Sequence, residues 1–112
     1  MIVCTTLGPD GVVGGGLGRA SHVALASVDD GQVTSWDEIE VGWDRLHGEG
    51  TEGSHHARIV KFLREHDVNV VVAKGVGEGM QRVLGNMGIR MALGLQGDAR
   101  QAVKQAAGGS GE

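Results

Sequence analysis

Two adjacent histidines are the residues of this chain best suited to chemistry. His55 and His56 stand at the predicted start of an amphipathic helix, and a glycine-rich loop before them carries a third, His47. A helix N-terminus offers unpaired N–H groups and a partial positive charge, so it attracts anions. Imidazole binds metal through a neutral nitrogen or, when protonated, donates hydrogen bonds. Together these groups would suit a negatively charged metal–sulfur cluster.

The spacing of the three histidines limits which of them can share one metal. Adjacent helical residues point about 100° apart, so His55 and His56 cannot easily chelate one small ion. One of them together with His47 from the loop is geometrically easier, and we predict His55 and His47 as metal ligands. The alternative is that the helix histidines are solvent-exposed capping residues.

Two glycine-rich segments could complete a ligand cleft. Gly75 and Gly77 follow an apolar strand and precede a helix, which is where open α/β sheets often bind ligands. That end of the sheet is also the end where the His55 helix begins, so we expect one shared cleft. The loop at 14–19 lacks the Gly-Lys-Ser/Thr ending of a phosphate loop and is more simply a mobile connection. Arg19 in it could still pair with an anionic cluster or its organic acid.

The first half of the chain predicts an antiparallel meander. Residues 1–6 form a strand, and residues 22–28 and 32–36 form a hairpin about an Asp-Asp-Gly turn. Alternating apolar residues extend its second strand towards Trp43, and residues 45–53 are expected to be loop.

The second half predicts alternating helices and strands. With Ser54 as N-cap, a helix should run to about residue 66. The later elements are a strand at 68–73, a helix whose apolar stripe ends near residue 87, a strand at 89–93 and a helix at 98–107. Such βαβ units need parallel strands with helices on the faces. We therefore expect a three-layer α/β domain over residues 1–107 with a mixed five-stranded sheet, and a flexible glycine-rich tail at 108–112.

Composition excludes several classes of partner. The chain has 112 residues, a net charge of −4 and only three aromatic residues, which argues against a nucleic-acid partner. It has no apolar run long enough to span a membrane and no recognisable signal peptide. Its single cysteine, Cys4, is compatible with a reducing compartment and most resembles a small buried hydrophobe. We expect a cytoplasmic protein that binds neither nucleic acid nor membrane.

Enzymatic activity is not expected. The predicted central strands contain no carboxylate that could hold catalytic metal ions, and Ser54 beside His55 is sequence adjacency without triad geometry. The edge strand instead carries Trp36 and leads to Trp43, and indoles exposed there could form a homodimer or docking surface.

The order of these elements gives the chain a family resemblance. The meander, the helix start with His55 and Ile59, and the segments 68–77 and 84–89 together resemble the dinitrogenase iron–molybdenum cofactor biosynthesis family. That family includes NifX-like and NafY-like carriers and the C-terminal domain of NifB, and the resemblance spans residue 1 to about residue 105. It implies a ribonuclease H-like fold with strand order 3-2-1-4-5, strand 2 antiparallel, and about three helices.

The resemblance also implies a function connected with nitrogen fixation. It predicts binding and transfer of an iron–sulfur or iron–molybdenum–sulfur cofactor or precursor, received from a donor protein and passed to an acceptor. The family histidine falls on His55, whereas Gly16 replaces the histidine of a His-Phe-Gly-Arg type motif that ends here at Arg19. The alternative is a metal-free interaction or regulatory module on the same fold. The predicted cofactor-binding residues are His55, His56, His47, Arg19, Gly75 and Gly77.

Overall fold

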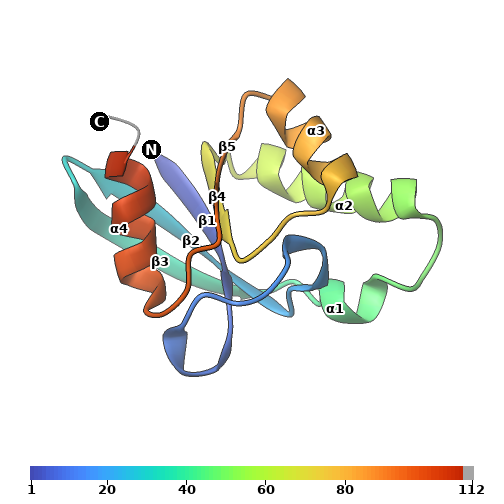
Figure 1. The fold of residues 1–112 in the computed structure, drawn as a ribbon, viewed down its shortest axis with the longest axis horizontal. Helices are drawn as coiled ribbons and strands as arrows, with labels where there is room; N and C mark the ends of the chain where they lie inside the picture. The colour runs from blue at the N-terminus through green and yellow to red at the C-terminus, as the bar shows by residue number, and fades with distance from the viewer. Residues whose placement is uncertain (110–112) are drawn as a thin grey trace.

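One mixed five-stranded sheet organises the chain (Figure 1). The computed structural model describes residues 1–109. The strands are β1 (Ile2–Leu7), β2 (His22–Asp29), β3 (Gln32–Glu40), β4 (Val70–Ala73) and β5 (Arg90–Leu93). Their order is β3-β2-β1-β4-β5, with β2 antiparallel to both neighbours and β1, β4 and β5 mutually parallel. The predicted sheet order is confirmed.

Helices cover both faces of this sheet. They are α1 (Trp43–Leu46), α2 (Glu52–Glu65), α3 (Glu78–Asn86) and α4 (Ala99–Gly109), with short 3-10 turns η1 (Pro9–Gly11) and η2 (Leu17–Arg19). Figure 1 shows α4 on one side of the sheet and α2 with α3 on the other. Of the predicted glycine-rich tail, residues 108 and 109 belong to the end of α4, and residues 110–112 lie outside the described residues.

Each face of the sheet builds its own hydrophobic core. On the α2 and α3 side, Cys4 and Val71 pack with helix residues such as Leu63. On the α4 side, Val3 and Val72 pack against a helix face made largely of alanine. All four residues of β4 are buried, which explains why its sequence is an uninterrupted apolar run.

The segment after β3 differs from the prediction. β3 ends at Glu40, and Trp43 begins α1 with only 2% of its surface exposed. Its ring packs edge-to-face against Phe62 at a centroid distance of 5.4 Å. The prediction of an exposed indole at Trp43 was wrong, because burying a large apolar ring against α2 is favourable. Trp36 is only partly exposed, since the Arg100 guanidinium lies 4.5 Å from its ring centroid.

The start of α2 also differs, and the difference moves the histidines. Thr51, not Ser54, is the N-cap: its hydroxyl accepts from the Ser54 N–H at 3.0 Å. The Ser54 hydroxyl in turn accepts from the Thr51 N–H at 3.1 Å, which completes a capping box. His55 therefore lies about one turn inside the helix, where its own N–H bonds to the Thr51 carbonyl. Both residue types cap well, so the sequence did not distinguish them.

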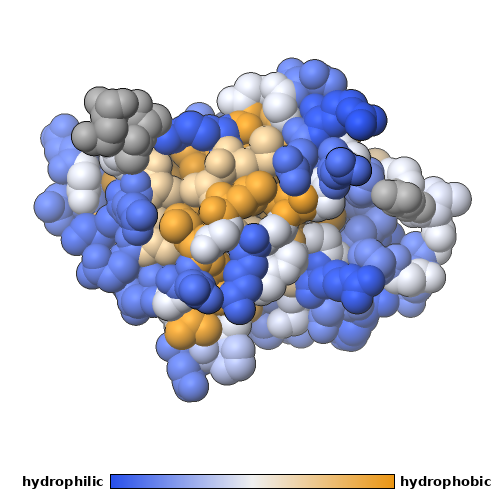
Figure 2. Space-filling model, in the orientation of Figure 1, coloured by the Kyte–Doolittle hydropathy of each residue, from blue (hydrophilic) through white to orange (hydrophobic). Residues whose placement is uncertain are grey.

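The face of the molecule drawn in Figure 2 is mostly polar and includes an apolar region. Apolar residues gather there between α4 and α3, in the area of β5, with hydrophilic residues around them. Leu93 at the end of β5 is 38% exposed. In the part of the chain that the structure describes, no helix is both long and apolar enough to cross a membrane.

Candidate functional site

The connection between β1 and β2 forms one wall of the site. It crosses the carboxyl ends of the parallel strands and is held there by backbone hydrogen bonds. The Val13 N–H donates to the Gly97 carbonyl at 2.8 Å, and the Leu17 N–H donates to the Gly75 carbonyl at 3.1 Å. We call residues 8–21 the first loop. These bonds fix it against the loops that follow β5 and β4.

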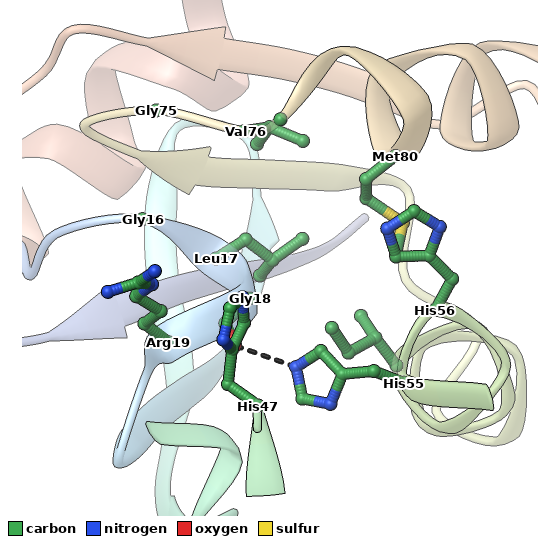
Figure 3. Close-up of a pocket in the computed structure, with 12 residues that line it drawn as sticks. Gly16, Leu17, Gly18, Arg19, His47, His55, His56, Gly75, Val76 and Met80 are labelled. Atoms are coloured by element: carbon green, nitrogen blue, oxygen red, sulfur yellow. Dashed lines mark hydrogen bonds between the residues drawn. The ribbon is translucent and has the colours of Figure 1, made fainter. Parts of the chain in front are cut away.

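A pocket of about 660 Å³ opens between the first loop, the beginning of α2 and the β4–α3 loop (Figure 3). This volume is within the range of about 300–1,000 Å³ that is usual for ligand sites. The six predicted cofactor-binding residues all line it, together with an apolar wall. The complete lining is Gly16, Leu17, Gly18, Arg19, His47, His55, His56, Ile59, Gly75, Val76, Gly77 and Met80.

His55 is nearly buried and both of its ring nitrogens have partners. Only 3% of the residue is exposed. Its Nε2 lies 2.7 Å from the Gly18 carbonyl oxygen, and its Nδ1 lies 2.7 Å from a guanidinium nitrogen of Arg58. A guanidinium can only donate and a carbonyl can only accept, so Nδ1 is unprotonated and Nε2 carries the proton. The two contacts together select one neutral tautomer.

The other two histidines lie on different sides of the pocket. His47 follows α1, is exposed, and its ring meets that of His55 nearly at right angles with a centroid distance of 5.3 Å. His56 is turned towards α3: Figure 3 shows it beside Met80, and a Cβ added to Gly79 would come within 3.2 Å of its Cε1. The divergence expected for adjacent helical residues is therefore observed for His55 and His56.

The glycines that line the pocket are not required by the backbone conformation; their lack of a side chain leaves space in the pocket. None of Gly16, Gly18, Gly75 and Gly77 has a positive φ. A Cβ at Gly16 would approach nothing closer than the Gly75 carbonyl oxygen at 3.8 Å. The pocket therefore has room for a side chain at position 16. Arg19 is exposed beside this position at the rim.

Several residues of the site were not predicted from the sequence. Leu17, Val76 and Met80 supply the apolar wall, and Arg58 orients His55. The spacing of three residues between His55 and Arg58 on a helix was a usable signal, since such residues are neighbours on its surface. The apolar residues carried no comparable signal, because they also belong to the core.

Thiolate ligation is not available in the pocket. Cys4 is fully buried in β1, and that burial raises the pKa of its thiol to about 12. Among the side chains that the structure describes, no three of His, Cys, Asp or Glu come together as a group that could hold a metal ion. The arrangement offers imidazole nitrogens, a guanidinium and backbone groups around an open hollow.

Comparison with solved structures places this fold among known ones. The apo form of the orange protein from Desulfovibrio gigas aligns with a TM-score of 0.77 at 21% identity, over 96% of this chain and 88% of that one. A putative NifB protein from Thermotoga aligns with 0.67 at 21% identity, over 96% and 88%. A putative dinitrogenase from Methanocaldococcus jannaschii aligns with 0.69 at 16% identity, over 97% and 89%. At these identities the likeness establishes the fold.

Sequence comparison establishes the family. No curated protein matches the chain. The profile of the dinitrogenase iron-molybdenum cofactor family, in contrast, matches residues 1–109, which is nearly the whole sequence. This chain therefore belongs to the dinitrogenase iron–molybdenum cofactor family, whose name connects it with the binding or biosynthesis of that cofactor.

Proposed function

We propose that the pocket binds an iron–sulfur or iron–molybdenum–sulfur cofactor, or a precursor of it, as a cargo. A donor protein would supply the cargo and an acceptor protein would receive it during metallocluster assembly. The observation that carries the proposal is the convergence of three imidazoles and one guanidinium on a single open pocket. Family membership supports the same class of cargo.

The charge of the pocket favours an anionic cargo. The chain as a whole has a net charge of −4. Its pocket lining, however, contains Arg19 and no carboxylate among the described residues. A concave site of opposite sign to the rest of the surface concentrates anions, and metal–sulfide clusters are commonly anionic.

The donor set favours reversible binding. His47 is the leading candidate for a metal ligand, because it is exposed at the pocket and its ring has no hydrogen bond to any residue whose side chain the structure describes. His55, also predicted as a ligand, would have to give up one of two hydrogen bonds first. A cluster held by one or two imidazoles, without thiolates, is easier to release than one held by several cysteines. Reversibility is what a carrier needs.

The proposal is tested by anaerobic reconstitution with iron, sulfide and molybdate, followed by absorbance and metal analysis. His47→Gln is compared with His66→Gln, which alters the histidine at the opposite end of α2. We expect stoichiometric colour and metal in the wild type and in His66→Gln. In His47→Gln, affinity should fall by at least about tenfold, since a ligand matters no less than the outer-shell groups whose loss costs 10–100-fold.

Failure of the wild type to retain metal would overturn the proposal. It would favour the alternative, a metal-free interaction or regulatory module. The free outer edge of β3, with Trp36 partly exposed on it, is the observation that would then gain importance. Equal loss of metal in both variants would also count against His47 as the ligand.

A further inference from the structure

We infer that His55 is a positioning residue that holds the first loop against α2, and that the nitrogens facing the cargo belong to other side chains. That nitrogens of other side chains face the cargo rests on the proposed function, whereas the contact of His55 with the first loop can be tested without any cargo. It reassigns the histidine that the sequence placed first among the predicted metal ligands. Three observations support it.

The first observation is the hydrogen bonding of the ring. Arg58 donates to Nδ1, and Nε2 donates to the Gly18 carbonyl, each across 2.7 Å. A metal bond at either nitrogen would leave a partner without its hydrogen bond in a nearly buried place, which is unfavourable. The guanidinium and the loop carbonyl therefore compete with a metal for this imidazole.

The second observation is what the ring holds in place. Gly18 belongs to η2, and the segment from Gly16 to Arg19 supplies four of the twelve residues around the pocket. On its other side this segment is bonded through the Leu17 N–H to Gly75. The bond from His55 joins the same segment to α2, so that the loop is fixed from both sides. The distance between loop and helix sets the width of the pocket and the direction of Arg19.

The third observation concerns His47. Its ring packs edge-to-face on the ring of His55, and both residues line the pocket (Figure 3). An imidazole fixed by two hydrogen bonds offers a rigid surface for a neighbour that is itself exposed. His55 thus orients the leading candidate ligand through contact with its ring. Groups of this kind often affect metal affinity by about 10–100-fold without touching the metal.

The decisive variants are His55→Gln and His55→Ala. A glutamine amide keeps one N–H donor for Gly18 and one oxygen acceptor for Arg58, but it is a poor ligand for a soft metal. We expect His55→Gln to retain the wild-type affinity for the reconstituted cluster and His55→Ala to lose about 10–100-fold. If His55→Gln binds as weakly as His55→Ala while remaining folded by circular dichroism, His55 is a ligand and the inference is wrong.

A second measurement needs no cluster at all. Nitrogen-15 NMR of the imidazoles should give the Nε2–H tautomer for His55 in the cargo-free protein. The amides of Arg19 and Ala20 bond to the Gly16 and Leu17 carbonyls, so their hydrogen exchange reports on η2. Exchange should accelerate in His55→Ala and not in His55→Gln. An Nδ1–H tautomer, or unchanged exchange in His55→Ala, would overturn the inference even if the wild type binds cluster normally.

Together the two measurements separate the inference from the proposed function. A wild type that takes up no cluster removes the proposed function and leaves the tautomer and exchange data to decide the role of His55. A wild type that takes up cluster, combined with full binding by His55→Gln, supports both.

Discussion

The two ends of the sheet are built from the same strands and helices but differ in their connections. At the carboxyl end of β1, β4 and β5 the chain makes long crossings, including the first loop and the segment around α1 that joins β3 to α2. They surround a pocket of about 660 Å³, whereas a hollow at the amino end, near Arg64 and Asn69, measures about 350 Å³. The long connections at the carboxyl end form the walls of the pocket, whereas the short turns at the amino end border the smaller hollow.

The amino end is closed by local backbone geometry and a few polar contacts. Asp67 and Gly88 adopt positive φ values of 53° and 76° in the turns that lead into β4 and β5. The Asn69 side-chain oxygen accepts from the Ile2 N–H at 2.7 Å, which ties the start of β1 to the turn before β4. The turns at this end therefore require particular residues because of their backbone conformation. The glycines that line the pocket have no positive φ, and what they provide is space for a ligand.

The largest expected effect concerns Cys4, which is fully buried in the interior of β1, away from the pocket. Burial raises the pKa of its thiol from 9.0 to about 12. The thiol therefore stays protonated in the folded protein, whereas in the unfolded chain it ionises from about pH 9. Ionisation of the unfolded state lowers the free energy of unfolding by about 1.4 kcal/mol per pH unit above pH 9, and by about 4 kcal/mol at pH 12.

Denaturant unfolding of the wild type and Cys4→Ala between pH 8 and 11 measures this effect. The alanine variant will be less stable near pH 8, because it leaves a small cavity, but its stability should depend less on pH. The difference in free energy of unfolding between the wild type and Cys4→Ala should decrease as pH rises. Parallel pH profiles would mean that water reaches the thiol and that the centre of the sheet is not sealed.

Much of the fold follows from local sequence pattern. The uninterrupted apolar run of β4 and the Asp-Asp-Gly turn before Gln32 are local signals, and the structure bears them out. The short helix at Trp43 is not a local feature. It depends on contact of the indole with Phe62, nineteen positions later, and on a bond from the Asp44 N–H to the Ala20 carbonyl. Such tertiary contacts override the strand pattern that continues past Glu40.

The second-largest expected effect concerns the pocket at the carboxyl end of the sheet. Gly16 lines the pocket and has room for a side chain, so Gly16→His would add an imidazole to the site. We expect the affinity for the reconstituted cluster to rise by about tenfold, which corresponds to about 1.4 kcal/mol. Gly15→His is the matched control: position 15 belongs to the same loop and is also unobstructed, but it does not line the pocket. A similar gain from both variants would show that added histidine binds metal nonspecifically.

The polar residues and two of the glycines of the candidate site could be predicted from the sequence, but its apolar wall and the role of each residue could not. Strand order brings the loop after β4 and the start of α2 to one end of the sheet, so the sequence could associate Gly75 with His55. The partner of His55 is a backbone carbonyl 37 residues away, at Gly18. Every residue has such a carbonyl, and no side-chain pattern marks which one a histidine will meet. The structure was therefore needed to determine how that ring is held.

The smallest effect compares one glycine from each end. Gly88 has a φ of 76°, which an L-amino acid adopts only with strain, so Gly88→Ala should lower the free energy of unfolding by about 1 kcal/mol. Gly75 has no positive φ and nothing within 4 Å of an added Cβ. Gly75→Ala should therefore leave stability unchanged or raise it by up to about 1 kcal/mol, because it reduces the freedom of the unfolded chain. Urea unfolding of both variants measures the difference. Opposite signs at positions 88 and 75 are required if backbone conformation constrains the turn at Gly88 and does not constrain Gly75 in the pocket. Equal destabilisation would mean that the backbone at Gly75 is as constrained as the turn at Gly88.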